Sequence, residues 1–247
     1  MTTVSDRMPA NTDQHFYEHE PVGREVIESH LVTMQKMSAH WLPKLRRWAG
    51  DRKLRVLEIG SGSCVLAALI TNEPMIESIT CTDISKTRME KALLSTLEIV
   101  PSQPGKIRNA EMDFNQSFPF GDATFDLVLC DAALHHARSM WFTLAEVNRV
   151  LKPGGVFLAQ REATLAPVTA GYVTRRLLTA PEFEAGVSEN IYSLGQYRYY
   201  LKIAGFDLEV IRAEPNWKFK ALAFLNGLVF ARFAFWSEKM SAPKYSN

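Results

Sequence analysis

The sequence predicts an α/β fold, a doubly wound and mostly parallel sheet with helices on both faces, preceded by an N-terminal helical cap. Three observations support this. After residue 50, short apolar runs alternate with helical stretches of ten or more residues, which is typical of a parallel sheet covered by helices. The chain has 247 residues, 47% hydrophobic and 22% charged, which fits one globular domain with appendages. The apolar runs are followed by glycines or aspartates, as in sheets that bind a ligand at the carboxyl ends of their strands.

The first 50 residues are expected to hold a flexible segment and then a helix. Residues 1–20 begin with a polar stretch that lacks the apolar region of a secretory signal, so we expect them to be flexible. Between Pro21 and Gly50, apolar residues recur at three- and four-residue steps, as they do on one face of a helix. This helix, bent near Pro43, would form the cap over residues 21–50.

Residues 51–247 are expected to form one domain. The runs that we assign to strands are Arg55–Ile59, Ser78–Thr82, Ile107–Met112, Phe125–Cys130, Val156–Gln160 and Asp207–Arg212. The helices expected between them are Val65–Thr71, Lys86–Leu97, Ser139–Val150 and Leu194–Ala204. The aromatic stretch Trp217–Trp236 would supply a last antiparallel strand and a covering helix, with contact to a membrane surface as the alternative.

Composition excludes several classes of protein. The 28 Lys and Arg against 27 Asp and Glu give a net charge of +1, which argues against a generic nucleic-acid-binding surface. The most hydrophobic stretch, Ala221–Ala231, is too short to span a bilayer, which takes about 20 residues. Three cysteines without CxxC spacing (Cys64, Cys81 and Cys130) are expected to be reduced and buried, as in a cytoplasmic protein.

Four carboxylates are predicted to gather at the carboxyl edge of the sheet: Glu58, Asp83, Asp113 and Asp131. Such an edge would repel the phosphates of a dinucleotide, but it suits a ligand with a ribose diol, an exocyclic amine and a positive charge, as in S-adenosylmethionine. A nicotinamide dehydrogenase remains the alternative, because Gly60 and Gly62 begin a GxGxxG pattern. Val65 stands where its third glycine would be.

The combination of motifs resembles the class I S-adenosylmethionine-dependent methyltransferases, in particular the branch that methylates small molecules such as ubiquinone precursors and natural-product sugars. The segments that carry the resemblance lie between Arg55 and Arg161: Leu57–Gly62, Thr82–Asp83, Asp113 with Phe118–Phe120, Phe125–Val128, Leu134–His136 and Glu146–Gly155. The resemblance implies a seven-stranded Rossmann-like sheet. The chain departs from the family at Cys64, where a glycine is usual.

The resemblance also implies roles for individual residues in binding the cofactor. Glu58 would orient the glycine loop, whose Gly60 and Gly62 would admit the methionine part. Asp83 would accept hydrogen bonds from both ribose hydroxyls. The remaining predicted contacts are Ile84 and Phe114 around adenine, Asp113 at its amino group and Asp131 near the methionine ammonium.

Two adjacent histidines, His135 and His136, follow the fourth strand and are the candidates for a catalytic base. We favour His135, which is nearer to the strand end; the alternative is that a histidine of the pair caps the next helix or packs beneath the cofactor. Tyrosines of the N-terminal segment and of a substrate-lid insert at about 163–200 are candidates for substrate binding: Tyr17, Tyr172 and Tyr192. No sequence cluster has metal-ligand spacing, so we expect metal-free transfer.

The predicted function is methyl transfer to a small-molecule acceptor, first of all O-methylation of a sugar, glycoside or other natural product. C- or N-methylation of a lipid or quinone-like substrate is the alternative within the same class. A non-catalytic S-adenosylmethionine-binding regulator is the alternative of another class. Neither a nucleic-acid partner nor a membrane span is expected, and the oligomeric state stays open.

Overall fold

A computed structural model describes residues 12–19, 22–165, 184–215 and 231–240, together with Gly171, Arg175 and Thr179. Its centre is a seven-stranded sheet in the order β3-β2-β1-β4-β5-β7-β6. The strands are β1 (Leu54–Ile59), β2 (Ile76–Asp83), β3 (Ile107–Glu111), β4 (Phe125–Asp131), β5 (Leu151–Ala163), β6 (Phe206–Pro215) and β7 (Ala231–Lys239). Neighbours among β1–β5 are parallel, whereas β7 runs antiparallel to both β5 and β6. The predicted α/β class and the mostly parallel sheet are confirmed.

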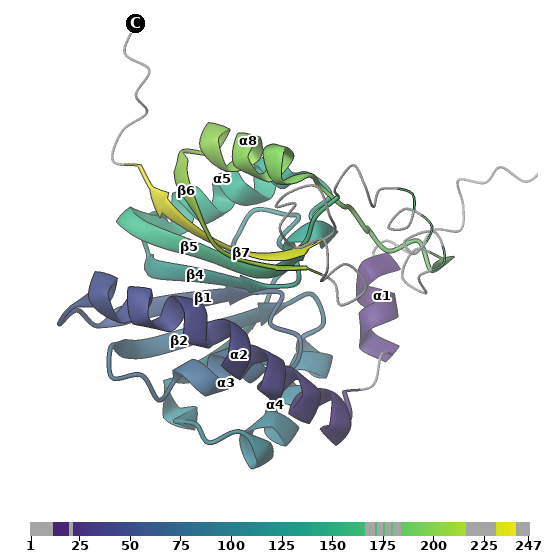
Figure 1. The fold of residues 1–247 in the computed structure, drawn as a ribbon. Helices are drawn as coiled ribbons and strands as arrows, with labels where there is room; N and C mark the ends of the chain where they lie inside the picture. The colour runs from purple at the N-terminus through teal and green to yellow at the C-terminus, as the bar shows by residue number, and fades with distance from the viewer. Residues whose placement is uncertain are drawn as a thin grey trace, which may run out of the picture.

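Helices cover both faces of the sheet (Figure 1). One face carries α2 (Arg24–Ala49), α3 (Val65–Ile70) and α4 (Lys86–Ile99), and the other carries α5 (Met140–Val150) and α8 (Leu194–Ile203). Each helix lies within a few residues of its predicted range. Serine N-caps fix three helix starts: Ser85, Ser139 and Ser193 each accept a hydrogen bond from a backbone N–H of the first turn.

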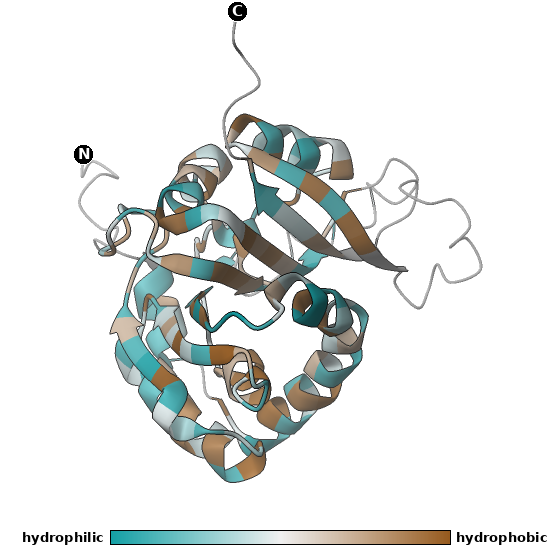
Figure 2. Ribbon diagram, turned by 90° about the vertical axis from the view of Figure 1, so that its left-hand side faces the viewer, coloured by the Kyte–Doolittle hydropathy of each residue, from teal (hydrophilic) through white to brown (hydrophobic). Residues whose placement is uncertain are grey.

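The alternation of side chains along the strands divides the core into two clusters. Val56 of β1 and Leu127 of β4 pack against α2, α3 and α4, whereas their neighbours Leu57 and Val128 pack on the side of α5 and α8. Figure 2 shows hydrophobic residues along the central strands and alternating hydrophobic and hydrophilic bands on the helices. Both faces of the sheet are therefore covered, and the carboxyl ends of the parallel strands are left as the place for a site.

The N-terminal segment differs from the expectation. Within residues 1–20, which the sequence predicts to be flexible, Thr12–His19 form the helix α1. The helix lies beside the carboxyl ends of the strands (Figure 1), where the side chains of Asp13 and Tyr17 find partners on other elements. These contacts are long-range in the sequence, so the polar composition of the segment gave no sign of them.

The C-terminal part completes the sheet. The expected antiparallel strand is present as β7, which begins at Ala231 and ends at Lys239 rather than at Trp236. The segment 217–230, where the covering helix is expected, and part of the predicted lid, including Tyr172, lie outside the described residues. Among the helices that the structure describes, none combines the length and the apolar character needed to cross a bilayer.

Candidate active site

A cavity, here called the main cavity, lies at the carboxyl ends of β1, β2 and β4. It brings together nine of the residues predicted from the sequence: Tyr17, Gly60, Gly62, Asp83, Ile84, Asp113, Phe114, Asp131 and His136. Further lining residues include Asp13, His30, Arg88, Asn115 and Arg161. The predicted cofactor-binding residues thus share one concave site, with the exception of Glu58.

The loop after β1 depends on its glycines. Gly60 has a φ of 63°, and a Cβ at this position would lie 2.6 Å from Cβ of Ala133, so no larger residue fits without movement of the backbone. Gly62 donates its backbone N–H to Oδ2 of Asp83 at 2.8 Å. Cys64 has a φ of 57°, the left-handed conformation that explains why a glycine is usual here. The loop therefore keeps a glycine-like backbone even with a cysteine.

Asp83 is held in place by backbone donors. Its Oδ2 accepts from Gly62 and its Oδ1 accepts from the N–H of Ser85 at 3.2 Å, and the residue is 8% exposed. Burial raises the pKa of Asp83, and the two backbone hydrogen bonds and the charge of Arg88 oppose that rise. A carboxylate fixed in this way at the carboxyl end of β2 can accept hydrogen bonds from a diol.

Asp113 and its neighbours form the other end of the main cavity. Oδ1 of Asp113 accepts from the N–H of Asn115 at 2.9 Å, and Oδ2 accepts from Nε2 of Gln116 at 3.3 Å. Phe114 and Ile84 supply apolar walls beside it. This end therefore pairs an acceptor with apolar surface, which suits a flat heterocycle that carries an amino group.

Glu58 does not face the main cavity. It is 1% exposed, is absent from the residues that line the cavity, and accepts a weak hydrogen bond from Sγ of Cys81 at 3.7 Å. Burial, reinforced by the negative charge of Asp131, raises the pKa of Glu58 to about 8. The side chain is therefore largely protonated at neutral pH, and the expected ring of four charged carboxylates loses one member.

Asp131 lines the main cavity, but its charge is already paired. Arg161 donates from Nε to Oδ1 at 2.7 Å and from Nη2 to Oδ2 at 2.6 Å, and Gln160 donates to Oδ1 at 3.1 Å. Such a bidentate pair is a strong charge-assisted contact. Arg161 and Ala132 both have positive φ, 60° and 50°, although neither is a glycine. Backbone strain of this kind gathers at functional sites.

A second hollow, here called the side cleft, adjoins the main cavity and shares Ala132 and Arg161 with it. The remaining residues that line the side cleft are His135, Ala163, Glu189, Asn190 and Ile191. The two predicted base candidates are thus separated, because His136 lines the main cavity and His135 lines the side cleft.

His135 is paired with a buried carboxylate. Its Nδ1 lies 3.0 Å from Oε2 of Glu162, which is 0% exposed. Burial would raise the pKa of Glu162, but the hydrogen bond and charge of His135 and the N–H groups of Leu134 and Ala133 outweigh it and hold that pKa below its usual value. Glu162 is therefore ionised and only accepts, so Nδ1 of His135 is the donor in this hydrogen bond.

His136 is engaged through both ring nitrogens. Its Nδ1 donates to the carbonyl oxygen of Ser188 at 2.8 Å, and its Nε2 lies 3.1 Å from the hydroxyl of Tyr17. Because the carbonyl can only accept, Nε2 of the neutral ring accepts from Tyr17. Burial, together with the charge of His135, lowers the pKa of His136 to about 4. His136 is therefore neutral at physiological pH, and its lone pair is in use.

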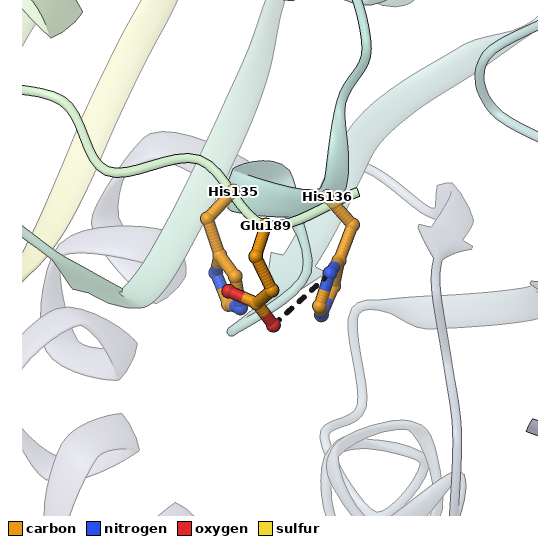
Figure 3. Close-up of side chains that lie close together, drawn as sticks. All are labelled: His135, His136 and Glu189. Carbon is orange, nitrogen blue, oxygen red and sulfur yellow. Dashed lines mark ion pairs between the residues drawn. The ribbon is translucent and has the colours of Figure 1, made fainter. Parts of the chain in front are cut away.

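Glu189 approaches both histidines (Figure 3). Figure 3 draws its carboxylate beside the two rings, whose centroids are 4.2 Å apart, and its Oε1 is 3.4 Å from Nδ1 of His136. Among the described residues, these three offer metal-ligand atoms within 4.8 Å of one another. An ion that took His136 would displace Ser188 or Tyr17. Sequence spacing did not reveal the group, because Glu189 lies 53 residues after His136.

Tyr192, a predicted substrate contact, lies outside both hollows. It packs edge-on against Tyr197 and Tyr200, and its backbone bridges Thr164. Sequence reasoning missed the residues that pair with the predicted ones, notably Asp13, Arg161, Glu162 and Glu189. Arg161 and Glu162 could have been found from the sequence, because they lie at the carboxyl end of the fifth strand, as Asp131 lies at the end of the fourth. Ligands of parallel sheets bind at these strand ends.

Part of the chain is similar to known methyltransferases. Residues 57–159 match a family model described as a methyltransferase domain. The chain is 29% identical over 185 residues to 27-O-demethylrifamycin SV methyltransferase of Amycolatopsis mediterranei, which covers 73% of this chain and 64% of that protein. It is 29% identical over 105 residues to demethylmenaquinone methyltransferase of Leptospira interrogans, which covers 42% of this chain and 41% of that protein. The chain therefore spans less than two thirds of these relatives.

Among solved structures, phosphoethanolamine N-methyltransferase 2 of Haemonchus contortus, in complex with S-adenosyl-L-methionine, superposes with a TM-score of 0.64. The sequences are 16% identical, and the match covers 92% of this chain and 60% of that one, so it supports the fold. The matched segment 57–159 runs from the glycine loop through the histidine pair and most of β5. By these matches the chain is similar to methyltransferases, over residues 57–159 in the family model and over most of its length in the fold.

Proposed function

We propose that the protein transfers a methyl group from S-adenosylmethionine to a hydroxyl of a small molecule, such as a sugar, a glycoside or another natural product. The observation that carries the proposal is the His135–Glu162 pair, in which His135 lines the side cleft next to the main cavity and Glu162 is buried. A base that faces a cleft beside a cofactor site is the arrangement that a hydroxyl acceptor requires.

The main cavity fits the cofactor by its own chemistry. Asp83 would accept from the ribose hydroxyls, Asp113 would accept from the adenine amine, and Ile84 and Phe114 would enclose the ring. Gly60 lines this cavity, and the absence of a side chain lets its backbone lie against Ala133. When bound, S-adenosylmethionine supplies an electrophilic methyl group on a sulfonium centre.

The step that this chain's residues perform is proton removal. Nε2 of His135 would take the proton of the acceptor hydroxyl as that oxygen is methylated, with S-adenosylmethionine as the methyl donor and S-adenosylhomocysteine as the leaving group. Glu162 stabilises the imidazolium that results, because its carboxylate is hydrogen-bonded to Nδ1. Arg161, paired with Asp131, lines both the main cavity and the side cleft.

The test is formation of S-adenosylhomocysteine with panels of glycosides, macrolide-type polyols, phenols and quinones. The proposal expects turnover with a hydroxylated acceptor, and mass spectrometry would place the new methyl group on oxygen. Turnover that occurs only with RNA or protein acceptors would contradict it.

C- or N-methylation of a lipid or quinone-like acceptor is the second candidate. A base such as His135 can also remove a proton from an activated carbon, and one of the relatives named above is a demethylmenaquinone methyltransferase. The same product analysis separates the two, because a methyl group on carbon or nitrogen gives a different fragmentation pattern from a methyl ether.

A further inference from the structure

We propose that Asp13 is a positioning residue that couples closure of α1 over the main cavity to the position of the 187–191 segment, which contributes to the side cleft. The inference rests on the proposed function, because it assigns the main cavity to the cofactor and the side cleft to the acceptor. The consequence is that a ligand bound in the main cavity reduces the local motion of the segment that contributes to the side cleft.

Asp13 ties α1 to two separate elements. Its Oδ2 accepts from Nη2 of Arg138 at 2.9 Å, and its Oδ1 accepts from the backbone N–H of Ser188 at 3.2 Å. Asp13 is 5% exposed, so its carboxylate is largely shielded from water, whereas the side chain of Arg138 is 50% exposed. An isolated helix of eight residues is unstable in water, so α1 depends on tertiary contacts. The carboxylate of Asp13, with two donors of which one is charged, supplies such a contact.

The contacts of Asp13 close into a ring. Ser188, which donates to Asp13, accepts from Nδ1 of His136 through its carbonyl oxygen. Nε2 of His136 accepts from the hydroxyl of Tyr17, which lies one helical turn after Asp13 and therefore on the same face of α1. The ring joins α1, the short 3-10 helix η3 (Leu134–His136) and the segment around Ser188.

The residues of this ring, or their immediate neighbours in the sequence, line both the main cavity and the side cleft. Asp13, Tyr17 and His136 line the main cavity, whereas Glu189 and Asn190, the residues after Ser188, line the side cleft. Asn190 extends the link, because its backbone N–H donates to the carbonyl oxygen of His135 at 2.9 Å. A ligand that holds α1 against the main cavity therefore also holds this segment beside the histidine proposed as the base.

The test is hydrogen exchange with and without S-adenosylhomocysteine, on the wild type, Asp13→Ala and Glu18→Ala. Glu18 is a matched control, because it lies on the same helix, carries the same charge and lines neither hollow. The probe is the amide of Asn190, which does not contact Asp13 directly. In the wild type and in Glu18→Ala we expect S-adenosylhomocysteine to slow exchange there about tenfold or more, because the ring passes order from α1 to this segment.

In Asp13→Ala we expect S-adenosylhomocysteine to bind, with affinity lowered by about tenfold or less, while the slowing at Asn190 disappears. Tyr17→Phe, which breaks the ring at its other end without a change of charge, should reduce the slowing as well. If Asp13 acts in folding alone, Asp13→Ala would speed exchange at Asn190 by the same factor with and without ligand, and the slowing by ligand would remain. That result would overturn the proposal.

Two further outcomes are distinguishable. Slowing at Asn190 in Asp13→Ala that equals the wild type overturns the coupling and leaves the proposed function standing. Failure of the wild type to bind S-adenosylhomocysteine overturns both. Thermal unfolding of each variant identifies any protein that is not folded, and in that case Arg138→Met removes the second partner of Asp13 and serves as the replacement test.

Discussion

Nδ1 of His135 donates to Oε2 of Glu162 across the carboxyl ends of β4 and β5, at 3.0 Å. The same carboxylate accepts from the backbone N–H groups of Ala133 and Leu134 at 3.1 and 3.0 Å. Glu162 thus fixes both the backbone that carries the histidine pair and the tautomer of the first histidine. This relationship separates the roles of two residues that are adjacent in the sequence.

Replacement of Glu162 by Gln should lower turnover about 10²- to 10⁴-fold, because the amide no longer stabilises the imidazolium or fixes the tautomer. The affinity for S-adenosylhomocysteine, measured by calorimetry, should change little, because Glu162 does not line the main cavity. Glu189→Gln is the matched control, and it should lose much less activity. Equal losses in the two variants would assign the effect to charge near the cleft in general.

His135→Ala and His136→Ala should fail in different ways. His135→Ala should lower turnover about 10²- to 10⁴-fold and abolish the acidic limb of the pH–rate profile, with cofactor affinity unchanged. His136→Ala should weaken the binding of S-adenosylhomocysteine, because the ring that holds Tyr17 over the main cavity is broken. Turnover against pH and calorimetry on both variants decide the matter. An acidic limb that survives in His135→Ala would move the base role elsewhere.

Asp83→Ala should weaken S-adenosylhomocysteine binding by about 1–3 kcal/mol, which is roughly 5- to 150-fold. Two effects combine there, the loss of the acceptor for the ribose and the loss of the acceptor for the N–H of Gly62. Asp113→Ala should cost less, because Phe114 and Ile84 keep the apolar walls. Titration calorimetry on folded variants measures both, and an unchanged affinity in Asp83→Ala would remove this residue from the cofactor site.

The fold was predictable to within a few residues for most elements, because it depends on local patterns. Apolar runs predicted β1 to β5, and apolar periodicity predicted the helices between them. The strand-end rule also placed Asp83, Asp113 and Asp131 correctly in the main cavity. A parallel sheet converts position in the sequence into position at one edge, so this part of the site needed no knowledge of long-range contacts.

The remaining features depend on contacts between distant residues. The sequence did not show that Arg161 would pair with Asp131 or that α1 would contact Ser188. Nor did it show that Glu58 would be buried and would not line the main cavity. Each is a tertiary contact of a polar side chain that composition treats as solvated. The charge state of the site is therefore less predictable than its location.

The buried carboxyl of Glu58 makes the stability of the protein depend on pH. Its pKa is about 8 in the folded protein against an ordinary value of 4.5. As pH rises from about 4.5 to 8, the unfolded chain releases this proton while the folded protein retains it, so the free energy of unfolding falls through that window. Glu58→Gln carries no such proton. Its free energy of unfolding relative to the wild type should therefore rise by roughly 1–3 kcal/mol between pH 5 and pH 8.

Denaturant titrations of both proteins across this range give the measurement as a difference. His136 contributes the opposite trend, because its lowered pKa of about 4 removes stability as pH falls from 6.5. That contribution is common to both proteins and cancels in the difference. Glu77→Gln, at an exposed position on β2, is the control and should give a flat difference. A flat difference for Glu58→Gln as well would mean that Glu58 is ionised in the folded state, and the main cavity would regain the charged carboxylate behind its glycine loop.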